Sequence, residues 1–469
     1  MPLIQPVELC PPEELGPVHF IAIGGSGMSG VAAMYAALGV RVSGSDKADS
    51  PVLAELRALG VRVHVGHDPA HLGDARTVVV SSAVRETNPE LALARARGLR
   101  VWHRSAALAA LMLGRVGVAV SGTHGKTTTS AMVAAMLTGC GADPGYVIGS
   151  PLGATGASYH HGAGAAFVVE ADESDGSMLQ YPAEVVVVTN VEADHLDNWG
   201  AAPAYADGLR RFACGPGVRV AVVCGDDEGA RELIRLVREC GTRVVVVGEA
   251  ADADVRLVDV RDDAGLARAR LIAADDEGEL RLAVPGRHNL SNAAAAYAVG
   301  RELGLDGPAL RAAAASFTGT RRRFEAVAEV AGVRIVDDYA HHPTELTATL
   351  RAARALAGPR RVVACFQPHL FTRTLEFADA FGAALALADE AVVLDVYPAR
   401  EDPIPGVTGE LVARAARLAM PGRVRYVPAL DDAPAALADL ARPGDLVVTL
   451  GAGDVTLVGP RLAALLEQR

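Results

Sequence analysis

Residues 117–132 read GVAVSGTHGKTTTSAM, a run of small apolar residues followed by a glycine-rich turn and a helix-like pattern. A short buried strand that enters a glycine turn and then a helix leaves several backbone N–H groups pointing at one place, where the helix dipole is positive. This arrangement suits a phosphate group. Lys126 would add a mobile positive charge for the outer phosphates, and the Thr127 hydroxyl would reach a bound magnesium ion.

The turn is shorter than the common phosphate-loop pattern G-x-x-x-x-G-K-[ST]. That pattern would place glycine where this chain has Val120, and the first glycine of the loop is instead Gly122. A glycine turn without a ligand is the alternative, but Gly-Lys-Thr at a strand–helix junction has few structural reasons to occur. We therefore predict that phosphate is bound by Gly122, Thr123, His124, Gly125, Lys126, Thr127 and Thr128.

The length of 469 residues predicts about three domains. Half of these are apolar and 4% are aromatic, which predicts Ala/Val/Leu packing between helices and sheets. The net charge of −12 argues against a general binder of nucleic acid or of anionic membranes. The six cysteines show no C-x-x-C spacing, so we expect free thiols in a reducing cytosol.

The start of the chain, MPLIQPVELCPPEEL, lacks a basic region followed by an apolar run, and it does not resemble a secretory signal. No segment reaches the roughly 18 uninterrupted apolar residues of a membrane span. We expect a cytoplasmic protein without membrane insertion, as a monomer or weak dimer.

From Val18 onward, short apolar runs alternate with longer amphipathic stretches, as in βαβ units with a parallel sheet. A G-x-G-x-x-G motif spans residues 25–30, and Asp46 follows the next predicted strand, where an acidic residue would bind ribose hydroxyls. This pattern fits NAD and a UDP-sugar equally well, since both present a pyrophosphate and a ribose; a tight glycine turn is the structural alternative. The candidate nucleotide-binding residues here are Gly25, Ser26, Gly27, Met28, Asp46, Ser81 and Ser82.

Two further predicted strands each end in an acidic cluster. EADESD, residues 170–175, follows one strand, and VEADHLDNW, residues 191–199, follows the next. Such loops are often only solvated, but beside a phosphate loop their carboxylates suit a magnesium ion. His195 is either a hydrogen-bonded spectator or a ligand.

The segment PGRHNLSNAAAAYAVG, residues 285–300, predicts a helix with Asn289 and Asn292 on one face. Asn289 either caps this helix or, like Asn292, meets an adenine or a phosphate-bound metal. The basic triplet 321–323 is either a solvated linker or a clamp on nucleotide phosphate.

The remaining third of the chain predicts another α/β sheet. Polar residues gather where its strands end: Asp338, Tyr339 and His342 after one strand, and His369 and Arg373 after the next. Strand carboxyl ends are the usual ligand edge of such a sheet. His369 and Arg373 would share one side of the chain if that turn is helical.

Taken in order, ten motifs resemble the Mur ligase family: HFIAIGGSGMSG, SGTHGKTTT, EADESD, VTNVEADHLD, GRHNLSNAAAA, RRRFE, DDYAHHPTE, FQPHLFTRT, VYPARE and GAGD. The resemblance covers nearly the whole chain. It implies three α/β domains: a Rossmann-like UDP-sugar-binding domain over residues 1–114, a central P-loop ATPase-type domain over 115–319, and a Rossmann-like amino-acid-binding domain over 320–469.

The resemblance is strongest to the branch that joins L-alanine to the lactyl carboxylate of UDP-N-acetylmuramate, with ATP and Mg²⁺, through an acyl phosphate. By resemblance, Lys126, Glu170 and His195 are the catalytic residues, and Thr127, Glu170 and His195 hold metal. ATP would also contact Asn289, Asn292, Arg323 and Asp338. The amino acid would be bound by Tyr339, His342, His369 and Arg373.

Three alternatives stay open. A ligase of the same family that recycles a preformed tripeptide would need a more open third domain. An NAD-dependent oxidoreductase would leave Lys126 and the acidic strand ends unexplained. A regulatory ATPase would hydrolyse ATP without an amino acid or a UDP-sugar.

Overall fold

The computed structural model describes residues 3–263, 265–399 and 401–468. It groups into two units. The first contains the chain up to Val258 with Arg270–Leu280 and Ser291–Ala314; the second contains Asp259–Ala269, Arg281–Leu290 and the chain from Ala315 onward. All six cysteines are free thiols.

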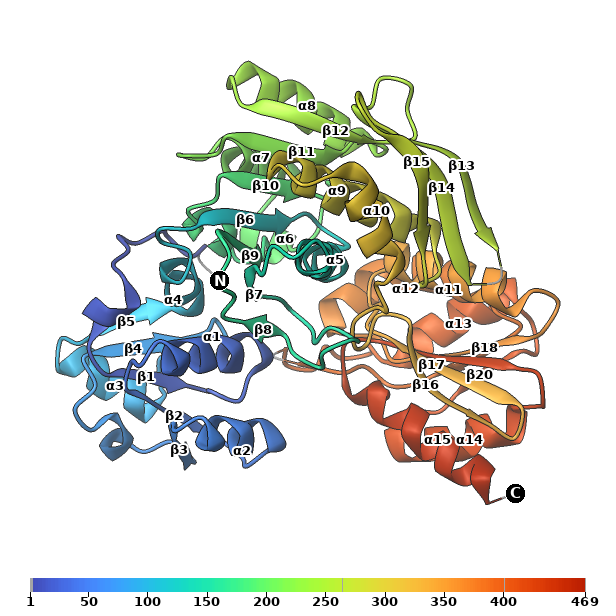
Figure 1. The fold of residues 1–469 in the computed structure, drawn as a ribbon. Helices are drawn as coiled ribbons and strands as arrows, with labels where there is room; N and C mark the ends of the chain where they lie inside the picture. The colour runs from blue at the N-terminus through green and yellow to red at the C-terminus, as the bar shows by residue number, and fades with distance from the viewer. Residues whose placement is uncertain (1–2, 264, 400, 469) are drawn as a thin grey trace. The chain divides into compact units, whose positions relative to one another are not determined.

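The first sheet, drawn in blue in Figure 1, has the strand order β3-β2-β1-β4-β5, and all its neighbours are parallel. Its apolar strands alternate with helices, as the sequence predicts. The strands are β1 (Val18–Ile21), β2 (Val42–Asp46), β3 (Arg62–Val65), β4 (Thr77–Val80) and β5 (Arg100–His103). The helices are η1 (Pro12–Leu15), α1 (Ser26–Ala37), α2 (Pro51–Ala58), η2 (Pro69–Leu72), α3 (Pro89–Ala96) and α4 (Arg104–Ala110).

The second sheet has the order β15-β14-β13-β12-β11-β10-β6-β9-β7-β8. Its strands are β6 (Val116–Ser121), β7 (Gly145–Val147), β8 (Tyr159–His160), β9 (Ala166–Glu170), β10 (Val185–Val188), β11 (Val220–Cys224), β12 (Arg243–Gly248), β13 (Val255–Asp263), β14 (Leu266–Ile272) and β15 (Glu277–Leu282). Its helices are α5 (Lys126–Gly139), η3 (Ser177–Gln180), α6 (Leu196–Trp199), α7 (Ala202–Ala213), α8 (Glu228–Glu239), α9 (Arg287–Glu302) and α10 (Gly307–Ala315). Strand β6 lies between β9 and β10, so the two acidic strand ends flank the phosphate loop.

The third sheet, in the second unit, has the order β16-β17-β21-β18-β19-β20, and only the pairing of β16 with β17 is antiparallel. Its strands are β16 (Glu325–Val330), β17 (Val333–Asp338), β18 (Val362–Phe366), β19 (Glu390–Val393), β20 (Val424–Tyr426) and β21 (Leu446–Leu450). Its helices are α11 (Pro343–Ala357), α12 (Phe371–Leu385), α13 (Gly409–Ala419), η4 (Leu430–Asp432), α14 (Ala433–Leu440), η5 (Asp454–Leu457) and α15 (Val458–Glu467).

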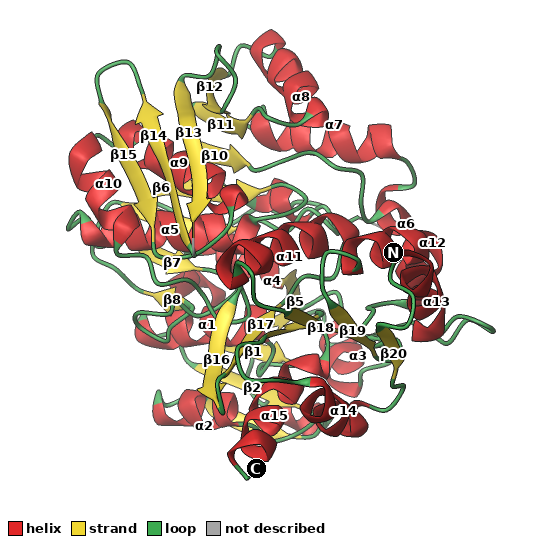
Figure 2. Ribbon diagram, turned by 90° about the vertical axis from the view of Figure 1, so that its right-hand side faces the viewer, coloured by secondary structure: helices red, strands yellow, loops and turns green. Residues whose placement is uncertain are grey.

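This third sheet is buried on both faces. Val362 and Ala364 pack in a cluster with α11, α12 and α13, whereas Val363 and Cys365 pack in another with α14 and α15 (Figure 2). Successive side chains of a strand point to opposite faces, so an unbroken apolar run is what a sheet with helices on both sides requires. The predicted α/β class with three sheets is confirmed, and the domain boundaries at 114 and 319 stay predictions.

None of the helices that the structure describes combines the length and the apolar character needed to cross a bilayer.

Candidate active site

The loop between β6 and α5 has the predicted strand–glycine turn–helix form. Gly122 has φ 122° and Gly125 has φ 83°, both in the region that side chains other than glycine rarely adopt. A Cβ atom added to Gly122 would lie 2.3 Å from the Thr189 hydroxyl. Backbone geometry therefore favours glycine at both positions, and the segment that follows β10 leaves no room for a side chain at Gly122.

Lys126, the first residue of α5, is held over this loop by three oxygen atoms. Its Nζ donates to the carbonyls of Gly122 at 2.8 Å and Thr123 at 2.9 Å, and it lies 2.7 Å from Oε2 of Glu173. Burial lowers the pKa of Lys126, but the nearby carboxylates, Glu173 first, outweigh it and raise the pKa. The ammonium group therefore stays charged at neutral pH, beside the positive end of the helix.

Glu173 is fully buried and is the carboxylate nearest to Lys126. Burial raises its pKa to about 7, against the lowering effect of Lys126. The sequence marks Glu173 as part of an acidic cluster but gives it no role of its own. No spacing within the acidic cluster separates it from its neighbours, because residues 171–173 form a loop and not a helix.

Glu170 and Thr127 come together as predicted for a magnesium site. The Thr127 hydroxyl donates to Oε1 of Glu170 at 3.0 Å, and Oε2 of Glu170 accepts from the backbone N–H of Gly149 at 2.8 Å. Neighbouring ligands of an octahedral Mg²⁺ at its usual bond length lie about 2.9 Å apart, and the ion prefers hard oxygen atoms. The donor set and spacing of Thr127 and Glu170 fit this ion.

His195 enters the same group from the other side of β6. Its backbone is left-handed, with φ 54°, and its Nε2 lies 3.7 Å from Oε1 of Glu173 and 3.5 Å from Asp194. Lys126 and His195 thus lie on opposite oxygens of one buried carboxylate. The role of His195 as a metal ligand stays a prediction. An imidazole nitrogen is not the hard donor that Mg²⁺ prefers.

The other predicted loop residues are fixed by side chains from α7 and from the segment that follows β10. The Asn190 amide bonds both the N–H and the C=O of His124, each at 2.9 Å. The Thr123 hydroxyl lies 2.8 Å from the Tyr205 hydroxyl. Asn292 is buried, with its Oδ1 3.0 Å from where a Cβ atom of Gly125 would be. Asn292 therefore lies against the phosphate loop, and Thr128 occupies the first turn of α5.

Asp46, which is predicted to bind the ribose, lies against the glycine loop of the first sheet. Oδ2 of Asp46, at the end of β2, accepts from the backbone N–H of Gly24 at 2.9 Å. The Met28 side chain is buried in the core, so only its backbone can serve as the predicted contact. The side chain of Ser26 lies outside the described residues.

The acidic loop at 170–175 divides its carboxylates between two partners. Glu170 and Glu173 face the phosphate loop, as described above. Asp172 lies 3.0 Å from Nη2 of Arg104, and Asp175 accepts from the Ser82 hydroxyl at 2.6 Å. The last two carboxylates therefore tie this loop to the elements that carry the predicted sugar-nucleotide residues.

Arg104, the first residue of α4, is a residue that the sequence analysis missed. A Cβ atom added to Gly27 would lie 2.0 Å from its Nη1. The guanidinium group therefore rests on the first turn of α1, inside the glycine motif. No spacing rule connects residues 27 and 104, which is why the sequence alone did not find it.

In the second unit, Asp338 ends β17 and organises the backbone around it. Its carboxylate accepts from the N–H groups of Phe324 at 2.7 Å and Ala340 at 2.8 Å. Burial raises its pKa to about 6, against the opposing effect of Arg323. The Tyr339 ring faces the Arg323 guanidinium, with 5.0 Å between them.

Of the basic triplet, Arg322 has a structural role. It donates to the carbonyl of Gly451 at 2.7 Å and so binds the loop that follows β21. Arg323, the predicted ATP contact, has its Nη1 4.0 Å from Glu345. Asn289 is in the first turn of α9, where its side chain donates to the Pro285 carbonyl at 2.7 Å.

The predicted amino-acid residues gather at the carboxyl ends of β17 and β18. The His369 ring lies 5.5 Å from the His341 ring, and the His342 ring lies 5.1 Å from Phe377. Arg373 is buried nearby in α12. The idea that His369 and Arg373 share a helical turn is wrong, because α12 begins at Phe371, after Leu370 with φ 69°.

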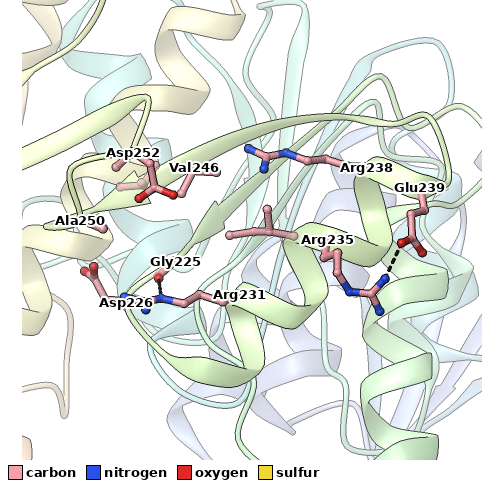
Figure 3. Close-up of a pocket in the computed structure, with 13 residues that line it drawn as sticks. Gly225, Asp226, Arg231, Arg235, Arg238, Glu239, Val246, Ala250 and Asp252 are labelled. Carbon is pink, nitrogen blue, oxygen red and sulfur yellow. Dashed lines mark hydrogen bonds and ion pairs between the residues drawn. The ribbon is translucent and has the colours of Figure 1, made fainter.

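A separate pocket of about 620 Å³ lies at the carboxyl ends of β11 and β12, beside α8 (Figure 3). It contains none of the predicted site residues. Two of its charged side chains, Arg235 and Glu239, pair with each other, and Arg231 donates to the Gly225 carbonyl at 3.0 Å. The candidate active site is therefore assigned to the loops around β6 and not to this pocket.

Three family models match the chain along its length. Residues 17–115 match the Mur ligase family, catalytic domain; residues 120–300 match the Mur ligase middle domain; and residues 322–453 match the Mur ligase, glutamate ligase domain. The chain belongs to the Mur ligase family.

Individual Mur ligases agree with this assignment. The chain is 63% identical over 469 residues to UDP-N-acetylmuramate–L-alanine ligase of Cutibacterium acnes, with 100% of this chain and 99% of that protein covered. It is 57% identical over 461 residues to the protein of the same name from Kineococcus radiotolerans, with 97% of each covered.

Solved Mur ligase structures share the fold. The UDP-N-acetylmuramate–alanine ligase MurC of Thermotoga maritima has a TM-score of 0.81 at 28% identity, over 96% of this chain and 99% of that one. The murein peptide ligase of Psychrobacter arcticus has a TM-score of 0.72 at 24% identity, over 97% and 99%.

Proposed function

We propose that this protein is an ATP-dependent ligase that joins L-alanine to the lactyl carboxylate of UDP-N-acetylmuramate during synthesis of peptidoglycan precursors. The observation that carries the proposal is the 63% identity, over the whole chain, to a relative named for that reaction. The phosphate loop with Lys126, Thr127 and Glu170 supports the ATP-dependent part. We place the reaction in the cytoplasm, where ATP is available.

The chemistry follows from the poor reactivity of a carboxylate. Oxide is a bad leaving group, so an amine does not displace it at neutral pH. Transfer of the γ-phosphoryl group of ATP to a carboxylate oxygen gives an acyl phosphate and ADP. The amine of L-alanine then attacks the carbonyl carbon, inorganic phosphate leaves with the former carboxylate oxygen, and the nitrogen loses a proton.

The first step brings two anions together, so catalysis depends on positive charge and on positioning. Lys126 would hold the β- and γ-phosphates at the N-terminus of α5, where the helix dipole adds to its charge. Thr127 and Glu170 would hold Mg²⁺, which supplies further positive charge to the phosphates when bound. His195 would lie close to this group, because Glu173 lies between His195 and Lys126.

The first sheet would bind the sugar nucleotide through the glycine loop at 24–30, with Asp46 near the ribose and Ser81 and Ser82 at the end of β4. Asn292, against Gly125, would contact ATP. In the second unit, the ATP contacts Asn289, Arg323 and Asp338 and the amino-acid contacts Tyr339, His342, His369 and Arg373 stay predictions from the resemblance.

Phosphate release in the presence of ATP, Mg²⁺ and UDP-N-acetylmuramate tests the proposal when amino acids are surveyed as co-substrate. L-alanine should stimulate release strongly. Glycine and L-serine test how small the acceptor site is, and a preformed tripeptide tests the recycling alternative. Stimulation by another amino acid or by the tripeptide, without any by L-alanine, would overturn the substrate assignment.

A further inference from the structure

Arg104 is in an electrostatically unusual place. Its guanidinium group lies against Gly27 in the first turn of α1, a helix of 12 residues. The N-terminus of a helix carries a partial positive charge, so a cation there is repelled. In the same turn, α1 has no acidic residue and no side chain that caps it. The helix therefore contributes nothing of its own to neutralise the arginine.

Asp172 supplies one compensating charge from the opposite side. It lies 3.0 Å from Nη2, whereas Nη1 is the atom that faces Gly27. Burial lowers the pKa of Arg104, but the carboxylates around it, Asp172 first, outweigh this and raise the pKa. The guanidinium stays charged, with one edge on a carboxylate and the other turned to the glycine loop.

We infer that Arg104 is a substrate-binding residue whose guanidinium group grips the pyrophosphate of the sugar nucleotide at the first turn of α1, and that Asp172 is the residue that positions it. An anion at this place would touch both the backbone N–H groups of the turn and Nη1. The N-terminus of α1 and the Arg104 guanidinium would then both contact negative charge, which offsets the repulsion between these two positive groups. A guanidinium group also suits phosphate by presenting two parallel donors. The inference rests on the proposed function only for the identity of the sugar nucleotide.

The ion pair between Arg104 and Asp172 connects the first glycine loop to the loop before α5. Asp172 lies between Glu170 and Glu173, which face Thr127 and Lys126. The arginine that grips one nucleotide is thus bonded to the loop that serves the other. The link explains why this acidic loop carries more carboxylates than a single magnesium site needs.

Titration calorimetry with UDP and with UMP, in the absence of ATP, tests the inference directly. UDP has the pyrophosphate and UMP does not. Arg104→Ala should weaken UDP binding by between about ten- and a hundredfold, the range for a charge-assisted hydrogen-bonded pair. UMP binding should change by less than about threefold. Arg104→Lys should fall between, because it keeps the charge and loses the two-pronged geometry.

Two further variants separate positioning from folding. Asp172→Asn should weaken UDP binding by about three- to tenfold and add nothing in an Arg104→Ala background. Arg97→Ala removes an exposed arginine at the end of α3 and should change the affinity for neither UDP nor UMP. If Arg104→Ala does not fold, Arg104→Lys carries the comparison.

Equal losses for UDP and UMP, or no loss for UDP, would overturn the inference. The proposed function alone would be overturned if Arg104→Ala weakens UDP binding as predicted but the wild-type protein shows no L-alanine-dependent phosphate release. Normal turnover with an unchanged ratio of UDP to UMP affinity in Arg104→Ala would overturn the inference alone.

Discussion

The molecule contains two glycine loops that lead from a parallel strand into a helix, and they obtain their positive charge in different ways. In the loop before α5, the cation is Lys126, which is part of the motif itself. In the loop before α1, the cation is Arg104, which comes from the start of α4. Both helices lack acidic residues in the first turn. The positive charge therefore comes from the motif itself in one loop and from a distant part of the chain in the other.

The difference shows what a linear pattern reveals. Lys126 directly follows the glycine turn in the sequence, so the motif itself favours phosphate over a glycine turn without a ligand. The first loop fits NAD and a UDP-sugar equally well because both present a pyrophosphate and a ribose, and the arginine that lies against this loop is outside the motif. The acidic loop at 170–175 joins the two, since it gives Glu173 to Lys126 and Asp172 to Arg104.

The largest effect is expected for Lys126→Ala. Removing the charge at the phosphate loop should lower kcat by at least about a thousandfold, because phosphoryl transfer depends on such charge. The affinity for UDP should change less than twofold. Steady-state phosphate release and calorimetry measure the two.

The matched control is Lys47→Ala, at the other lysine of the chain, which is exposed. It should leave kcat unchanged. Retained turnover in Lys126→Ala would remove the second loop from the mechanism.

Glu170→Gln should have the next largest effect. The amide keeps the shape but loses the charge beside Thr127, so kcat should fall by about a hundredfold and the Mg²⁺ concentration for half-maximal activity should rise. A magnesium titration of turnover measures both. Glu184→Gln, at an exposed carboxylate before β10, is the control and should titrate as wild type. An unchanged magnesium requirement in Glu170→Gln would contradict its role.

Gly27→Ala tests the first loop without removing any charge. The added Cβ atom would lie 2.0 Å from Arg104 Nη1 and must displace the guanidinium, so KM for the sugar nucleotide should rise about tenfold. Alanine is a better helix former than glycine by about 1 kcal/mol, so the melting temperature should not fall.

Gly30→Ala is the control in the same motif. Its Cβ atom would have ordinary contacts, at 3.5 Å and beyond, and KM should stay within about twofold. Similar KM values in Gly27→Ala and Gly30→Ala would show that displacing the Arg104 guanidinium from the loop does not affect binding of the sugar nucleotide.

The smallest effect on activity is expected for Glu90→Gln, in helix α3 beside the first sheet. Glu90 is fully buried, and the nearby His19 ring together with hydrogen bonds from Ser45 and His71 outweighs burial and lowers its pKa to about 2. The carboxylate therefore stabilises the fold fully above its ordinary pKa, near 4.5, and this contribution is lost as the pH falls toward 2. The variant should be about 2 kcal/mol less stable at pH 7.

Urea unfolding as a function of pH checks this expectation. The difference in the free energy of unfolding between wild type and Glu90→Gln should shrink below pH 4.5, while KM for ATP stays within about twofold. A difference that is constant with pH would show that the loss is one of packing and not of charge.

The sequence predicts the parts of the molecule that local chemistry controls. The short apolar runs predict the strands, because parallel strands buried on both faces must be apolar throughout. Gly122, Gly125, Lys126 and Thr127 predict their own loop, since their roles follow from their spacing. Glu170 is predictable because it ends an apolar strand.

The parts that the sequence does not predict arise from tertiary contacts. Glu173 is one of four similar carboxylates until β9 is placed beside β6, where it alone becomes fully buried against Lys126. Arg104 has no motif. The sequence also leaves open whether the turn at His369 is helical, and the structure shows that it is not, because Leu370 has φ 69° and α12 begins at Phe371.

The most direct test of the central claim follows an oxygen atom. UDP-N-acetylmuramate labelled with ¹⁸O in its lactyl carboxylate is incubated with ATP, Mg²⁺, L-alanine and the enzyme, and the released phosphate is analysed by mass spectrometry. The acyl-phosphate route predicts one ¹⁸O atom in each phosphate released, because the bridging oxygen leaves with phosphorus. Unlabelled phosphate, with the label retained in the product or transferred to AMP, would contradict it.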